Sequence, residues 1–136
     1  MPNTPQRLWQ LFYQRTAYMA YAVAAADKHV SPSEIIALKR EISEYWLGIE
    51  QTKDNFGTDA AYQVEIVFDI LVEKGLSAER SFEIFSEYVR EHRNFLTDDL
   101  KMTLIHLANA IAISFHGANK SELNMLLRIQ QLLLQQ

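Results

Sequence analysis

Acidic side chains after the first apolar segment are the groups in this chain best placed to do chemistry. Asp27 directly follows an alanine run, and Glu34 lies seven residues further on. An acid at the C-terminal end of a helix opposes the helix dipole, at a cost of about 0.3–1 kcal/mol when exposed, so a compensating interaction is expected. Either the Asp27 carboxylate accepts backbone N–H groups of the following turn or pairs with Lys28 or His29, or it binds a divalent cation together with Glu34 and the carbonyl oxygens that end the helix.

Several features favour the structural interpretation of this turn over the metal site. Two carboxylates are few for calcium, which takes about six to eight oxygen ligands. The turn lacks the alternating Asp/Asn ladder and central glycine of an EF-hand. Ser31 and Glu34 also form an S-x-x-E capping box, which would occupy Glu34 in capping. The structural interpretation is therefore favoured. If the turn does bind a cofactor, we expect a divalent cation with Asp27 and Glu34 as its ligands.

A second acidic row consists of Glu65, Asp69 and Glu73, at four-residue spacing on one predicted helix. Like charges at this spacing disfavour a helix by a few tenths of a kcal/mol per pair. Asp69 has apolar neighbours on both sides, so its edge could be partly buried. A solvated acidic face is the favoured interpretation.

Residues typical of catalytic sites do not converge in this sequence. His106 lies within an apolar segment and is predicted to be a core histidine, and the chain has no cysteine. Neither an H-E-x-x-H pattern, a Walker loop nor a G-x-S-x-G elbow occurs. Aromatic residues are predicted to belong to the core rather than to a ligand cage: Trp9, Tyr13, Tyr18, Tyr21, Phe82 and Phe85. We expect no enzymatic activity.

The composition is that of one globular domain spanning residues 1–136, with 49% hydrophobic residues. The net charge of -4 argues against nucleic-acid binding, which favours a basic surface. The apolar run of residues 17–26 is ten residues long, and a bilayer span needs about 20. We therefore expect no membrane span, and a cytoplasmic location rather than an organellar one.

The elements that must position these side chains are all helices. Apolar residues recur at helical spacing and no segment alternates with a period of two, which predicts an all-α bundle of about six helices. A polar linker is expected at residues 48–57. The predicted helices are Pro5–Ala26, Pro32–Leu47, Thr58–Glu73, Ser77–Arg93, Thr97–Phe115 and Asn119–Leu134.

Two helix-turn-helix segments have related sequences. The capping box of Ser31 and Glu34 returns 88 residues later as Asn119 and Glu122. Each is preceded by a helix with small residues, Ala20–Ala26 and Ala108–Ala112, which should allow these two helices to pack closely near the centre. Two degenerate pseudo-repeats explain this pattern, and convergent use of a common cap is the alternative.

In these segments, A-A-A-D-K-H-V-S-P-S-E and A-I-S-F-H-G-A-N-K-S-E, the chain resembles the TerB-like family, which is named for tellurite-resistance proteins and includes N-terminal domains of DnaJ-like co-chaperones. Lys28 replaces the usual glycine, and Ser114 or Phe115 stands where the second acid is expected. The resemblance implies an all-helical fold, a cytoplasmic setting and a non-enzymatic role in stress response or complex assembly. It also implies metal binding at Asp27 and Glu34.

Two functions are compatible with these observations. The favoured one is an interaction module, metal-responsive if Asp27 binds a cation, that contacts a protein partner through a groove between helices or an acidic face. The alternative is a small-molecule or lipid binder, or an unusual hydrolase, which requires a closed cavity lined by the aromatic residues and His106. The sequence names neither the partner nor the oligomeric state.

Overall fold

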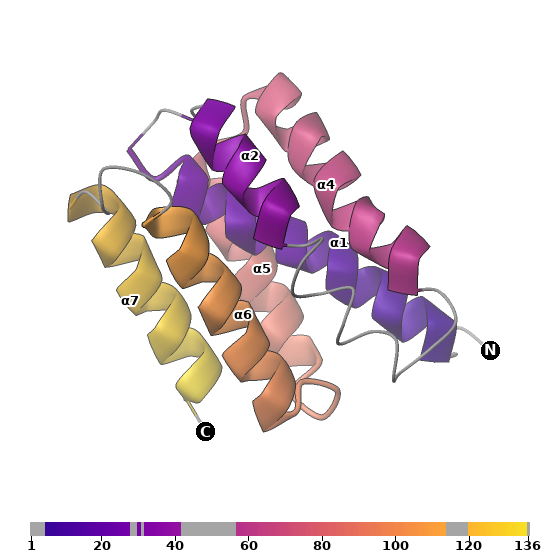
Figure 1. Cartoon of the computed structure of the whole chain (residues 1–136). Helices are drawn as coiled ribbons and strands as arrows, with labels where there is room; N and C mark the ends of the chain where they lie inside the picture. The colour runs from indigo at the N-terminus through magenta and orange to yellow at the C-terminus, as the bar shows by residue number, and fades with distance from the viewer. Residues whose placement is uncertain (1–4, 28–29, 31, 42–56, 114–119, 136) are drawn as a thin grey trace.

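The computed structural model describes residues 5–27, 30, 32–41, 57–113 and 120–135 (Figure 1). Within these ranges the secondary structure is helical and no strand is found, so the all-α class is confirmed. The helices are α1 (Pro5–Ala24), α2 (Pro32–Glu41), α4 (Gly57–Lys74), α5 (Ala78–Glu91), α6 (Asp98–Ala112) and α7 (Lys120–Leu134).

Each segment that the sequence predicts as helical overlaps one of these helices. The observed ends of α1 and α6 are shorter than predicted, because residues 25–27 form a turn and Ile113 caps α6 in a non-helical conformation. The rest of the second predicted helix, residues 42–47, lies outside the described residues, as do 48–56 of the linker. Parts of both repeat turns, residues 28, 29 and 31 and residues 114–119, lie outside them as well.

Helix α1 is the central element of the bundle. It packs against α4, α5, α6 and α7, and it runs through the bundle with α4 on one side and α6 and α7 on the other (Figure 1). Residues 19–25 are all buried, so this part of the chain is enclosed on every side. A helix that is apolar all round is stable only when neighbours cover it. Of the helices that the structure describes, none is both long and apolar enough to cross a bilayer.

Small side chains are frequent where the end of α1 contacts its neighbours. Five alanines in α1 or directly after it are buried: Ala17, Ala20, Ala22, Ala24 and Ala25. On α6, Ala108 and Ala112 are buried as well. Helices α1 and α6 pack against each other, as their small residues predict.

Larger aromatic rings pack at the other end of α1. Trp9 contacts Phe12 and the Phe95 ring edge-on, with ring centroids 5.6 and 5.2 Å apart, and so joins α1 to the turn between α5 and α6. Every aromatic residue predicted for the core is buried or packs against the core, which confirms that prediction.

The prediction for His106 is wrong, because this side chain is exposed on α6. Its sequence neighbours Ile105 and Leu107 are buried. Successive residues of a helix point about 100° apart, so two buried neighbours can flank a residue that faces solvent. His106 shares its exposed side with Met102 and Ile113.

We expect Ala20→Leu to lower the free energy of unfolding by about 1–3 kcal/mol, because residue 20 is fully buried and a larger side chain must displace neighbouring helices. The matched control is Gln14→Leu, which adds a leucine at an exposed position of the same helix and should change stability by less than about 0.5 kcal/mol. Urea unfolding measures both. Equal stabilities for the two variants would contradict the central role of α1.

Candidate functional site

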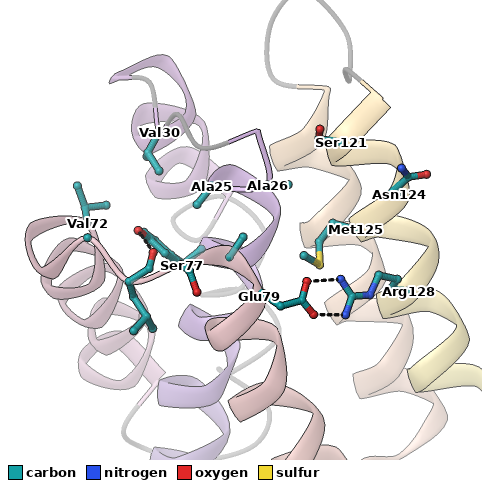
Figure 2. A pocket seen from close by; sticks show the side chains of 14 residues that line it. Ala25, Ala26, Val30, Val72, Ser77, Glu79, Ser121, Asn124, Met125 and Arg128 are labelled. Atoms are coloured by element: carbon teal, nitrogen blue, oxygen red, sulfur yellow. Dashed lines mark hydrogen bonds and ion pairs between the residues drawn. The ribbon is translucent and has the colours of Figure 1, made fainter.

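A cleft of about 770 Å³ lies where the end of α1, the turn from α4 to α5 and the first half of α7 meet (Figure 2). Its apolar wall includes Ala25, Ala26 and Val30 after α1, together with Val72 and Leu76. Helix α7 contributes Ser121, Asn124, Met125 and Arg128. The cleft is therefore built from three parts of the chain that are distant in sequence.

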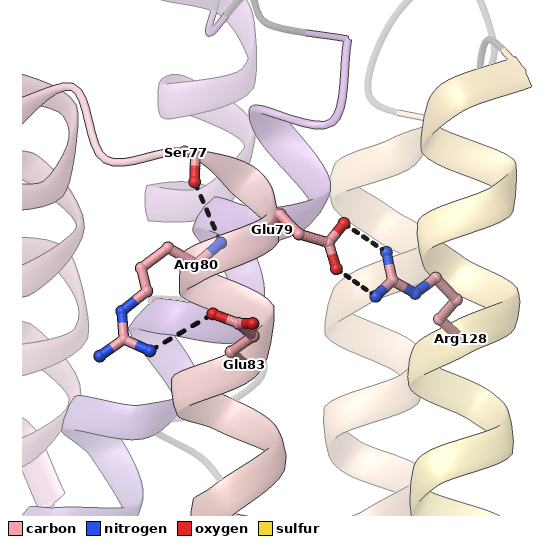
Figure 3. Close-up of polar contacts among 5 residues, drawn as sticks. All are labelled: Ser77, Glu79, Arg80, Glu83 and Arg128. Carbon is pink, nitrogen blue, oxygen red and sulfur yellow. Dashed lines mark hydrogen bonds and ion pairs between the residues drawn. The ribbon is translucent and has the colours of Figure 1, made fainter.

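The turn from α4 to α5 is fixed by local sequence. Gly75 adopts φ 67°, which is the left-handed conformation that glycine accepts without steric cost. The N–H of Gly75 donates to the Val72 carbonyl at 3.2 Å and the N–H of Leu76 donates to the Leu71 carbonyl at 3.4 Å, which is a Schellman ending of α4. Ser77 then caps α5 by accepting the Arg80 backbone N–H at 3.0 Å (Figure 3).

Two side-chain hydrogen bonds attach this turn and α5 to α1. The Tyr21 hydroxyl donates to the Leu76 carbonyl at 2.6 Å, and the Ser81 hydroxyl donates to the Tyr18 carbonyl at 2.7 Å. Burial raises the pKa of Tyr21, so its hydroxyl stays protonated and serves as a donor. These bonds fix one wall of the cleft against the central helix.

An ion pair between Glu79 of α5 and Arg128 of α7 stands at the edge of the cleft (Figure 3). The two terminal nitrogens of the Arg128 guanidinium group, Nη1 and Nη2, donate to the carboxylate at 2.8 and 2.5 Å. The guanidinium also lies over the Phe82 ring, 4.3 Å from its centroid. Hydrogen bonding from Arg128 lowers the pKa of Glu79, and the same bond raises the pKa of Arg128. Both groups are therefore charged and neutralise each other.

The lining of the cleft mixes apolar and polar groups. The polar side chains are those of Tyr21, Ser77, Glu79, Ser121, Asn124 and Arg128. Ser77 caps a helix, Tyr21 holds the turn, and Glu79 and Arg128 satisfy each other. Such a surface can hold a group that is partly apolar and that also makes hydrogen bonds.

The described part of the structure does not test the predicted metal site at Asp27 and Glu34. Asp27 is exposed, one residue after the cleft-lining Ala26. Glu34 belongs to α2, but its side chain lies outside the described residues. In the described ranges, no group of three or more carboxylate or imidazole side chains is suited to a metal ion. The metal site stays a prediction.

The acidic row on α4 is largely solvated, as predicted, but it has a basic partner that the sequence pattern did not reveal. Lys39 of α2 lies 3.8 Å from the Asp69 carboxylate. Glu65 is half-buried, and burial raises its pKa; Lys39 opposes this shift and Asp69 adds to it. The two side chains of this ion pair are distant in sequence, so helical spacing alone could not indicate it.

Sequence reasoning also missed the pairing of Glu79 with Arg128. Glu79 lies in the first turn of α5 and Arg128 lies on α7. They lie 49 residues apart, and no spacing rule connects them. The cap at Ser77 carried a local signal, and the prediction that α5 starts there is confirmed.

We expect the ion pair to make stability depend on pH in the acidic range. The pKa of Glu79 is lower in the folded chain than in the unfolded chain. The ion pair therefore adds to the free energy of unfolding above the unfolded pKa of about 4.3, and this stabilisation is lost as the pH falls through the folded pKa. The side chains are 61% and 41% exposed, so the pair should contribute about 1 kcal/mol or less at pH 7.

Urea unfolding of wild type, Glu79→Gln, Arg128→Met and the double variant should give this coupling at pH 7 and none at about pH 2. The control is Glu83→Gln, which removes an ion pair with Arg80, three residues away on the same helix. A coupling that persists unchanged at the lowest pH would rule out the proposed electrostatic origin.

Comparisons of the chain with protein-family models, with curated proteins and with solved structures found no match. The resemblance to the TerB-like family therefore stays a prediction that rests on the two turn motifs.

Proposed function

We propose that this chain is a non-enzymatic helical interaction module whose cleft receives an apolar group of a partner protein. The observation that supports this most directly is the combination of an apolar wall with polar groups that already have structural partners. We place the module in the cytoplasm, in stress response or complex assembly, as the resemblance to the TerB-like family implies. The proposal includes two pseudo-repeats in a bundle of about six helices.

The size and character of the cleft fit the anchor of a protein partner. Its volume lies within the range of about 300–1,000 Å³ that is usual for binding pockets. Binding energy at protein interfaces is concentrated in side chains that fill such pockets, with polar groups around them. Val30, Val72 and Met125 provide the apolar contact, while Ser121 and Asn124 provide hydrogen-bonding groups.

Electrostatics favours an uncharged anchor. Glu79 and Arg128 carry opposite charges and are joined by two hydrogen bonds, so the edge of the cleft has no net charge from this pair. A charged occupant would lose solvent beside a pair that is already neutralised, without a free counter-charge from either member. A leucine, methionine or aromatic side chain of a partner helix avoids this cost.

A small-molecule or lipid binder remains the second candidate, because the cleft volume would also suit such a ligand. That hypothesis expects a cavity lined by aromatic residues and His106. Tyr21 does line the cleft, whereas His106 does not and is exposed on α6.

Filling the cleft tests the proposal. Ser121→Trp places a large side chain at an exposed position of the cleft. It should reduce recovery of the partner from a cell extract about tenfold, and calorimetry with the purified partner should show a similar loss of affinity. The matched control is Glu87→Trp, at an exposed position of α5 that does not line this cleft, and it should bind as the wild type does.

A partner retained equally by both tryptophan variants would refute the cleft as the contact site. Titration with Nile red, a neutral apolar dye, separates the second candidate. The small-molecule function would be favoured by two results together: Ser121→Trp abolishes dye binding, and no protein is recovered in an amount that depends on residue 121.

The metal-responsive part of the proposal predicts that one divalent cation stabilises the metal-stripped chain through Asp27. At a concentration about 100 times its Kd, the ion should add about 2.7 kcal/mol and raise the thermal midpoint by several degrees. Asp27→Asn should abolish the shift, and Asp98→Asn, an exposed acid on α6, should not. If Ca²⁺, Mg²⁺, Mn²⁺ and Zn²⁺ leave the wild type unchanged, the Asp27 turn is structural.

A further inference from the structure

A second, smaller pocket lies between α1 and α5, apart from the cleft. Its volume is about 80 Å³. A water molecule takes up about 30 Å³ in the liquid, so the pocket has room for one molecule of only a few non-hydrogen atoms. Its polar lining residues are Arg15 of α1 and Glu87, Tyr88, Glu91 and His92 of α5.

Opposite charges line this pocket from the two helices. Arg15 is half-buried, and its guanidinium group lies over the Tyr18 ring, 5.3 Å from the centroid. Glu87 and Glu91 are exposed and lie one helical turn apart on α5. Among the ion pairs of the described residues, none joins Arg15 to either carboxylate. Both signs of charge are therefore available to a ligand.

Tyr88 brings a buried polar group to the same pocket. Its side chain is 3% exposed, and its hydroxyl has no hydrogen-bond partner in the described part of the chain. Burial raises the pKa of Tyr88, while the nearby positive charge of Arg15 opposes this rise. The hydroxyl thus stays protonated and can donate. A buried hydroxyl without a partner costs free energy, which an acceptor beside it would recover.

His92 supplies a hydrogen-bond acceptor. Its Nδ1 atom lies 3.1 Å from the Tyr88 carbonyl oxygen. A carbonyl oxygen only accepts, so Nδ1 carries the proton of the neutral ring and Nε2 is left as an acceptor. The imidazole also stacks on the Tyr88 ring, with centroids 4.7 Å apart. The stacking and the hydrogen bond together hold the orientation of the ring.

We propose that this pocket binds a small zwitterion, namely an α-amino acid of about the size of glycine. Its carboxylate accepts hydrogen bonds from the Arg15 guanidinium group and the Tyr88 hydroxyl. Its ammonium group donates to Glu87 or Glu91 and to Nε2 of His92. A ligand with a single charge meets a like charge as well as an opposite one here, whereas a zwitterion satisfies both. The volume leaves no room for a long side chain.

The binding should be weak. The ligand competes with rotation of the Arg15 side chain toward the carboxylates of α5, and an exposed ion pair of that kind is itself worth little. We therefore expect a Kd for glycine in the range of about 1–10 mM.

Titration with glycine to about 20 mM, followed through the backbone amide shifts of the isotope-labelled chain, tests the proposal. Residues 11–15 and 84–92 should show saturable shifts. Acetate and methylammonium each carry one of the two charges and should bind about tenfold more weakly or not at all. Leucine carries both charges but has a larger side chain, so it should give no saturable shift.

Two variants test the assigned contacts. Arg15→Met should weaken glycine binding about tenfold or more, and Tyr88→Phe about two- to tenfold. Tyr88→Phe removes only a hydroxyl without a partner, so the fold should be retained. The matched control is Arg90→Met, which removes an exposed positive charge from α5 outside the pocket and should leave the Kd unchanged. Circular dichroism checks that all three variants fold.

The two tryptophan variants separate this pocket from the cleft. Ser121→Trp should bind glycine as the wild type does, whereas Glu87→Trp should lose glycine and keep the partner of the cleft. Failure of the cleft proposal and failure of this one are therefore distinguishable. Shifts that rise linearly without saturation, acetate binding as tightly as glycine, or a glycine Kd unchanged in both Arg15→Met and Tyr88→Phe would each overturn the proposal.

Discussion

Complete burial of residues 19–25, at the end of α1, is the constraint on which the rest of the structure depends. Residues 19–25 have no exposed side, so at every angle around them another helix must supply cover. Helices α4, α5, α6 and α7 do so. Alanine is well suited to this position, because its small side chain lets several helices approach one axis at once. The other helices are therefore arranged around a helix segment that is rich in alanine.

The cleft is a consequence of this arrangement. Helix α1 ends at Ala24, and residues 25 and 26 line the space between the turn after α4 and the start of α7. Tyr21 holds that turn in place from within the buried segment, and Glu79 joins α5 to Arg128 across the opening. The wall of the cleft is therefore bonded to the core, and Tyr21, Glu79 and Arg128 already have partners within the chain.

Arg128 joins α7 to α5 at the edge of the cleft. It donates two hydrogen bonds to Glu79, and its guanidinium group lies over the Phe82 ring. Because the two opposite charges are paired, they add no net charge to this side of the cleft. The contact that holds the two helices together therefore also sets the electrostatics of the cleft edge.

The sequence by itself determined the helical class, the approximate helix ranges and the local ends of several helices. Helices start at Ser77 and Thr97 as predicted, and both side chains act as N-caps in the structure, because capping and periodicity are properties of a few consecutive residues. The tertiary structure decided that His106 is exposed, that Lys39 reaches Asp69 and that Glu79 pairs with Arg128. These outcomes depend on the rotation and approach of whole helices around α1, which packing against distant residues sets and no local spacing records.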